Sequence, residues 1–346
     1  MKKINLYVYP HAVPHDHDVN PDRAPLVNTV PLSNAGIKKH CNIVSPEEAD
    51  YFYMGQVCNS QHWNNPTSNA IVRYNEDSFQ FFKGNEHKHI CDYEGEGGQE
   101  TGSGGVPIPE WLHNSILTIN GPLKRYSNIK KMFTRPTFSY LFISLKDKKE
   151  VFDLPNNISM GFRGVRNHPA RITLQNTMKQ FPDIKDKSEF HITQDWHGLA
   201  SVGSTVHKEF MSTMHNNIIS LCPRGSGIDS ARLLETCYFT RVPVLISDHD
   251  YYIPGEDHYD TSFLYRICHE GLFHPARFED IPGPAENYLR NELLNIYNTD
   301  IAELHRRALL ARKYFENVIQ RYFEDPTLYF FEWLNKKLEW LNKQNA

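Results

Sequence analysis

A turn rich in glycine and arginine follows the apolar stretch 217–222 and carries the clearest chemistry in the chain. Gly225 and Gly227 would let backbone N–H groups approach a ligand closely. Asp229 or Ser230 would cap the helix that follows, whose N-terminus carries a partial positive charge. A turn of this kind favours an anion.

Three charged side chains around this turn suit a nucleoside diphosphate. Arg224 lies in the turn and Arg232 lies one turn into the expected helix, so two guanidinium groups would converge on phosphate oxygens. Glu235 shares the helix face of Arg232 and would accept hydrogen bonds from the vicinal hydroxyls of a ribose. The same spacing also fits a surface ion pair beside an ordinary tight turn, and spacing alone leaves both interpretations open.

Alternating strand and helix patterns surround the turn and indicate a doubly wound α/β domain in the second half of the chain. Strands are predicted at 158–164, 217–222 and 242–247, and helices at 169–179 and 229–239. Residues 158–164 run into a glycine turn that contains Arg163, which would add positive charge to the same anion site or would have a structural role.

The first half indicates a second parallel sheet, with strands predicted at 5–9, 49–54 and 115–119. Residues 94–105 contain six glycines and would form either a lid or a linker. Amphipathic helices are predicted at 301–322 and after Pro326. We therefore expect an N-terminal domain at 1–156, a second domain at 157–325 and a C-terminal helix at 326–346.

Composition limits the class of protein. The 346 residues carry a net charge of -4, which gives no general positive field for a nucleic acid. No stretch of roughly 20 apolar residues indicates a membrane span, and the N-terminal apolar stretch is too short for a signal sequence. The six cysteines include no Cys-x-x-Cys pair, so we expect free thiols, with disulfides as the alternative. A soluble, cytoplasmic protein is expected.

The residues around the turn also carry a resemblance to a known family. Cys222-Pro223-Arg224-Gly225, then Ser230-x-Arg232-x-x-Glu235 and Val242-Pro243-Val244, resemble the signature of the exostosin-like glycosyltransferases, family 47. Weaker similarity continues upstream in the segments Tyr7-Val8-Tyr9, Ala49-Asp50-Tyr51-Phe52-Tyr53 and Gly84-Asn85-Glu86-His87, and together the resemblance covers residues 4 to 290. Departures occur at Thr236, where the family has Ala, at Thr240-Arg241, where it has Gly-Cys, and at Glu86, where it has Asp.

The resemblance implies a GT-B architecture, in which two Rossmann-like domains face each other across a cleft. The C-terminal domain would bind a nucleotide sugar, usually UDP-linked, through Arg224, Gly225, Ser230, Arg232 and Glu235, and the N-terminal domain would bind the acceptor. The reaction would transfer the sugar with inversion, without a metal cofactor, to a hydroxyl of an oligosaccharide or glycoprotein glycan. A catalytically inactive nucleotide- or glycan-binding module is the alternative.

An inverting transfer needs a general base that takes the proton of the acceptor hydroxyl. Asp92 is the first candidate, followed by His87 and Glu94, because all three lie on the acceptor half beside the glycine-rich segment. Solvated loop charges are the alternative interpretation of these residues.

Two patterns would instead suggest a metal ion. Asp248-His249-Asp250 has the D-x-D form that holds manganese through carboxylate oxygens in GT-A transferases. His15-Asp16-His17-Asp18 has the residue types of a transition-metal chelate, although a polar surface loop is the preferred interpretation of this segment. Activity in excess EDTA separates a metal-independent enzyme from a manganese-dependent one.

Overall fold

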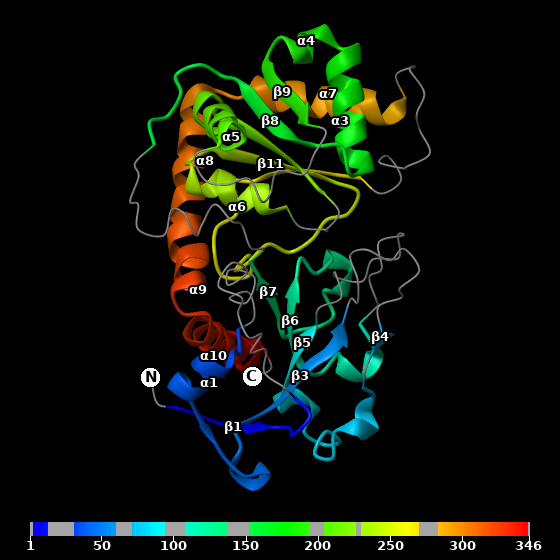
Figure 1. The fold of residues 1–346 in the computed structure, drawn as a ribbon, viewed down its shortest axis with the longest axis vertical. Coiled ribbons are helices and arrows are strands. Elements are labelled where there is room, and N and C mark those ends of the chain that lie inside the picture. The colour runs from blue at the N-terminus through cyan, green and yellow to red at the C-terminus, as the bar shows by residue number, and fades with distance from the viewer. Residues whose placement is uncertain are drawn as a thin grey trace. The chain divides into compact units, whose positions relative to one another are not determined.

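The computed structural model is an α/β protein with two sheets of mainly parallel strands, each flanked by helices (Figure 1). It describes residues 3–12, 31–59, 71–72, 74–93, 108–136, 152–193, 204–225, 230–269 and 283–344. The chain forms two compact units. Unit 1 comprises Met1–Pro136, Tyr251–Gly255 and Val318–Ala346, and unit 2 comprises Thr137–Asp250 and Glu256–Asn317.

Unit 1 is built on a seven-stranded sheet with the order β2-β1-β3-β5-β6-β7, in which β4 pairs with β3. All pairs are parallel except β3 with β4. The strands are β1 (Ile4–Val8), β2 (Cys41–Ile43), β3 (Tyr51–Asn59), β4 (Ile71–Val72), β5 (His89–Tyr93), β6 (Ile116–Asn120) and β7 (Met132–Arg135). All five residues of β5 are buried, as expected for a central strand covered on both faces.

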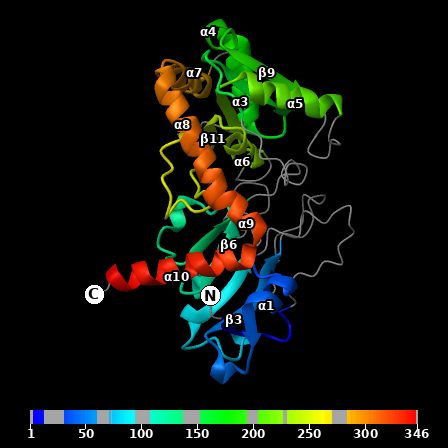
Figure 2. The same ribbon diagram turned by 90° about the vertical axis from the view of Figure 1, so that its left-hand side faces the viewer.

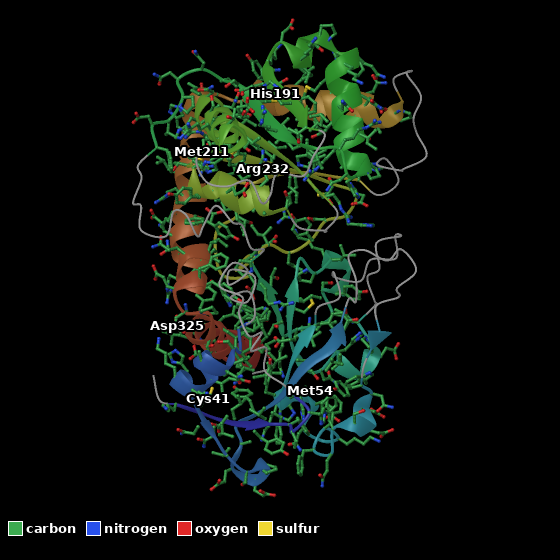
Figure 3. The ribbon with its side chains drawn as sticks, viewed as in Figure 1. Cys41, Met54, His191, Met211, Arg232 and Asp325 are labelled. Carbon is green, nitrogen blue, oxygen red and sulfur yellow. The ribbon has the colours of Figure 1, made fainter. Side chains whose placement is uncertain are left out.

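Two helices of unit 1 pack against each other, α1 (Asn34–His40) and α10 (Pro326–Gln344) (Figure 2). A Cβ atom on Gly36 would lie only 1.8 Å from the hydroxyl of Thr327, so the absence of a side chain there permits the close approach. Asp325, just before α10, accepts hydrogen bonds from Lys39 and His40 at the end of α1 (Figure 3). These contacts join α10 to α1.

Unit 2 is built on a five-stranded, fully parallel sheet with the order β12-β11-β10-β8-β9. The strands are β8 (Met160–Val165), β9 (Ser188–Thr193), β10 (Ile219–Pro223), β11 (Val242–Ser247) and β12 (Tyr265–Cys268). The first and third strands of the unit in chain order lie side by side. This is the strand order of doubly wound folds, and its switch point lies between β8 and β10.

Helices α3 and α7 of unit 2 pack against each other, and α6 packs against α8. The helices are α3 (Pro169–Gln180), α4 (Pro182–Lys185), α5 (Thr205–Asn216), α6 (Ala231–Tyr238), α7 (Pro284–Tyr297) and α8 (Ile301–Tyr314). After α8 the helical chain continues through η7 (Phe315–Gln320), a π-helical turn, and α9 (Arg321–Glu324). No helix in the described part of the chain is long and apolar enough to cross a membrane.

The strands and helices predicted around the chemical turn are confirmed, with shifts of one or two residues. The glycine turn predicted at the end of residues 158–164 is wrong, because Gly164 lies within β8 and pairs with Ile192. A Cβ atom on Gly161 would lie 2.8 Å from Asn217 Nδ2, so that glycine serves close packing. The elements that were not predicted are the strands β2, β4, β5, β7, β9 and β12 and the helices α1, α4, α5 and α7.

The predicted division at residue 156 falls between β7 and β8, and its exact position stays a prediction. The C-terminal helix groups with unit 1. The glycine-rich segment 94–105 lies outside the described residues.

The chain reverses after α6 through Thr240 and Arg241, two positions where the sequence departs from the exostosin pattern. Thr240 has a φ of +58°, in the left-handed region that β-branched residues rarely adopt. Arg241 is 1% exposed, and its guanidinium donates to Met214 O and His215 O at the end of α5 and to Phe239 O after α6. Burial lowers its pKa to about 10. Arg241 therefore satisfies the carbonyl groups that two helix ends leave open.

We expect Thr240→Gly to be more stable than Thr240→Ala by about 1 kcal/mol, because both remove the same γ-atoms but only glycine relaxes a positive φ. The free energies of unfolding, measured in urea, check this order. If residue 240 had an ordinary helical or extended conformation, the alanine variant would be the more stable of the two. An alanine variant as stable as the glycine variant would therefore contradict the left-handed conformation.

Candidate functional site

The carboxyl ends of β8 and β10 form the switch point of the unit 2 sheet, which is where ligands bind in doubly wound folds. The turn after β8 leads into α3, and the turn after β10 begins at Arg224. A Cβ atom on Gly225 would lie 3.6 Å from Asn167 Nδ2, so the two turns are in contact distance of each other. Four arginines gather at or beside these strand ends, and their partners define the candidate site.

Arg224 is 1% exposed and forms the most buried ion pair of the site, with 2.6 Å between its Nη1 and Asp248 Oδ1. Its backbone N–H donates to Ile246 O at 2.9 Å, which ties the turn to β11. Burial acts to raise the pKa of Asp248, but the charge and hydrogen bond of Arg224 outweigh it and hold that pKa below its usual value. Arg224 Nε is buried without an acceptor among the described residues.

Arg171, in the first turn of α3, joins the two strand ends. Its Nη1 donates to Val165 O at 3.0 Å, at the end of β8, and its Nε donates to Arg224 O at 3.1 Å, just after β10. A Cβ atom on Gly225 would lie 3.0 Å from Arg171 Nη2, so Gly225 leaves space for this guanidinium. Burial, and then the charge of Arg232, lower the pKa of Arg171 to about 10. Arg171 was not predicted from the sequence, because a charged residue in a helical turn usually faces solvent.

Arg232 lies on α6 (Figure 3), and its guanidinium carbon is 4.6 Å from the ring centre of Phe210 and 5.6 Å from that of Phe162. Its Nη2 donates to Arg163 O at 2.6 Å. Its Nε lies 3.3 Å from Glu235 Oε2, and both side chains are about 85% buried, so the pair is not the surface ion pair of the alternative interpretation. Arg232 Nη1 is buried without an acceptor among the described residues. Aromatic packing and a carbonyl thus fix this guanidinium.

Arg163 lies within β8, and its Nη2 forms an ion pair with Glu209 of α5. Its Nε is buried and finds no acceptor in the part of the chain that the structure describes. The side chain therefore belongs to the strand end and not to a glycine turn. Together, Arg163, Arg224 and Arg232 each retain one buried N–H donor without an acceptor there.

The start of α6 differs from the expected cap. Ser230 occupies the N-cap position and is buried, but its side chain makes no capping hydrogen bond. Gly227 and Asp229 lie outside the described residues. Of the predicted nucleotide ligands, the structure thus brings Arg163, Arg224, Arg232 and their neighbours together, and leaves the role of Ser230 a prediction.

His168 is the N-cap of α3, and it was not predicted as a site residue from the sequence. Its Nδ1 accepts the Ala170 N–H at 3.1 Å. Burial and then the charge of Arg224 lower its pKa to about 4, although Asp248 acts in the opposite direction. The imidazole is therefore neutral near pH 7, with its proton on Nε2.

Asp92 and His87, the two candidates for the general base that lie within the described residues, are in unit 1 at opposite ends of β5. Asp92, in β5, is fully buried, and its two carboxylate oxygens accept hydrogen bonds from Tyr53 and Thr118. His87 is exposed and precedes the amino end of β5, whereas Asp92 lies near the carboxyl end. Burial, and then Lys131, lower the pKa of His87. Glu94 lies outside the described residues.

The D-x-D residues point to different partners. Asp248 binds Arg224, and Asp250 Oδ1 lies 2.5 Å from Arg266 Nη1. Within the described residues, no group of three His, Cys, Asp or Glu side chains is arranged to hold a metal ion. The segment His15–Asp18 lies outside those residues.

Comparison with models of known protein families gives no match for the chain, and comparison with curated protein sequences also gives none.

We expect Asp248→Asn to lower the free energy of unfolding by about 3 kcal/mol, because it leaves the buried charge of Arg224 without a carboxylate. Urea unfolding measures the loss. Asp250→Asn is the matched control: its partner Arg266 keeps a second carboxylate, Glu256, at 2.9 Å, so the loss there should stay below about 1 kcal/mol. Equal losses in the two variants would contradict the role given to Asp248.

We also expect stability to fall as the pH decreases from 6.5 to 4. His168 has a pKa of about 4 in the folded protein, against 6.5 when unfolded, so the unfolded chain binds the extra proton first in this window. His89, buried in unit 1, has the same shift to about 4, mainly through burial. Urea unfolding at several pH values measures the slope. His168→Asn should flatten it in part, because Asn caps the helix without titrating, and an unchanged slope would exclude His168 as its source.

Proposed function

We propose that this protein is an inverting glycosyltransferase that moves a sugar from a UDP-sugar donor onto a hydroxyl of a glycan acceptor. The observation that carries the proposal is the set of arginines at the switch point of unit 2. Arg163, Arg224 and Arg232 each keep a buried N–H donor without an acceptor among the described residues. Buried donors of this kind are costly unless an acceptor pairs with them, and a diphosphate offers several acceptor oxygens.

The resemblance of the same residues to the exostosin-like glycosyltransferases supports this assignment and gives it a sugar chemistry. In this proposal the two units are the Rossmann-like domains of a GT-B enzyme, with the donor bound by unit 2 and the glycan acceptor bound by unit 1. Glu235 would accept hydrogen bonds from the ribose hydroxyls. Its carboxylate would then bind the ribose and Arg232 at the same time.

The proposed reaction is an in-line displacement at the anomeric carbon. The acceptor oxygen forms a bond to that carbon as the bond to the diphosphate oxygen breaks, and a base takes the acceptor proton. Guanidinium groups would stabilise the negative charge of the departing diphosphate, with no metal cofactor assigned to this step. The positive charge for this role would come from the four arginines at the strand ends: Arg163, Arg171, Arg224 and Arg232.

A binding module without catalytic activity is the second candidate, and the position of Asp92 favours it. An acceptor hydroxyl could reach the Asp92 carboxylate only by displacing Tyr53 or Thr118 from a fully buried site. Asp92, His87 and Glu94 therefore stand as proposed bases whose assignment depends on a measurement of turnover.

We expect Arg163→Lys and Arg232→Lys each to weaken UDP binding at least about tenfold, because lysine keeps the charge but loses the planar set of donors. Isothermal titration with UDP measures the affinity. Arg290→Lys is the control. Arg290 lies on α7 and forms an ion pair with Asp183 of α4, so the same substitution there should leave UDP affinity unchanged. Equal affinity in all three variants, or no binding of UDP to the wild type, would contradict the proposed donor site.

Slow release of UDP from UDP-sugars in the absence of acceptor separates the enzyme from the binding module. The enzyme should hydrolyse its donor slowly, and it should do so in excess EDTA if no metal takes part. UDP binding without turnover on any donor or acceptor would support the module.

A further inference from the structure

The turn between β8 and α3 places a second polar group at the switch point, the imidazole of His168. His168 follows the end of β8 by three residues and is the N-cap of α3. Titratable side chains from three neighbouring elements act on the pKa of His168. They are Arg171 on α3, Arg224 after β10, and Asp248 and His249 after β11. The imidazole thus lies beside the most buried arginine of the proposed donor site.

The backbone at the start of α3 has no N–H group left for a ligand in its first three positions. Pro169 has no N–H, and the Ala170 N–H donates to His168 Nδ1. The Arg171 N–H donates to His168 O at 2.9 Å. An anion at this end of α3 must therefore be bound by side chains and not by the helix backbone.

The same hydrogen bond fixes the tautomer of His168. Because Nδ1 accepts from Ala170, the neutral ring carries its proton on Nε2. A proton on Nδ1 would break the cap and would place a positive charge at the positive end of the helix, beside Arg224. Within the described residues the hydrogen bond of the ring is the one at Nδ1, and the neighbouring Arg224 Nε, in a side chain that is 1% exposed, is buried without an acceptor there.

We propose that His168 is a ligand of the nucleoside diphosphate, and that its neutral imidazole donates Nε2–H to a phosphate oxygen. This inference rests on the proposed function, because it needs a diphosphate at the switch point. It adds a binding residue on β8–α3 to the arginines of the turn after β10. The burial that lowers the pKa of His168 to about 4 is consistent with a donor that stays neutral at physiological pH.

Two substitutions separate ligand binding from helix capping. His168→Asn keeps a side-chain oxygen that accepts the Ala170 N–H, but it has no donor at the distance of Nε2. His168→Ala removes both groups. UDP and GDP are titrated into the wild type by calorimetry, and the tighter of the two is then titrated into each variant, with thermal unfolding measured in parallel.

The expected result is that His168→Asn unfolds at nearly the wild-type temperature but binds the nucleotide about tenfold more weakly. His168→Ala should lose affinity by a similar factor and also unfold at a lower temperature. In protein labelled with ¹⁵N-histidine, adding the nucleotide should shift the Nε2–H resonance of His168 and leave its Nδ1 unprotonated.

Unchanged affinity of His168→Asn, or an unshifted His168 resonance when the nucleotide is bound, would overturn the assignment of His168 while leaving the donor site intact. Failure of the wild type to bind either nucleotide would overturn the proposed function and this inference together. If His168→Asn does not fold, the resonance of the wild-type imidazole alone decides between the two outcomes.

Discussion

Burial of positive charge at the carboxyl ends of β8 and β10 is the constraint on which the rest of unit 2 depends. A guanidinium group removed from water costs several kcal/mol unless its charge and its N–H groups are compensated. Arg171 is compensated by the carbonyl groups of strand ends, and Arg224 by Asp248. These interactions hold the two turns in place. The positions of the strand ends therefore depend on the buried arginines, and the arginines can be buried only because the strand ends supply their acceptors.

The hydrogen-bond donors of the buried arginines in unit 2 are satisfied to different degrees. Arg241 donates to carbonyl groups at the ends of α5 and α6, and its donors have acceptors. Arg163, Arg224 and Arg232 each leave one buried donor without an acceptor among the described residues. Satisfied buried donors stabilise a fold, whereas unsatisfied ones at a switch point are expected where a ligand supplies the missing acceptor.

The sequence predicts the strands and helices around this site better than it predicts the side-chain contacts within the site. The apolar strand, the turn and the helix from 217 to 239 follow from periodicity and glycine placement, and the structure has β10 and α6 there. A turn is expected at Gly164 because glycine often marks one, but the parallel pairing of β8 with β9 keeps it in a strand. Arg171 and His168 were not predicted because their partners are backbone groups, which leave no signal in residue type.

The same limit applies to the departures from the family pattern. Nothing in the sequence alone indicates that Arg241 is buried, since arginine is mostly exposed in proteins. Its role depends on two helices that end beside it, and one of them, α5, was not predicted. Thr240 adopts a positive φ that glycine, the residue of the exostosin-like pattern at this position, adopts without strain.

Unit 1 contains the complementary case, a buried polar group whose hydrogen bonds are made within the protein. Tyr53 and Thr118 donate to the two oxygens of Asp92, and burial together with the Asp92 charge raises the pKa of Tyr53 well above its ordinary value. Tyr53 therefore stays protonated and keeps donating across the physiological pH range. A carboxylate held in this way is suited to fixing β3, β5 and β6 in register, and a base for the proposed transfer needs an accessible oxygen or nitrogen. Asp92 thus has its two oxygens occupied within unit 1, whereas Arg163, Arg224 and Arg232 in unit 2 each keep a buried N–H group without an acceptor among the described residues.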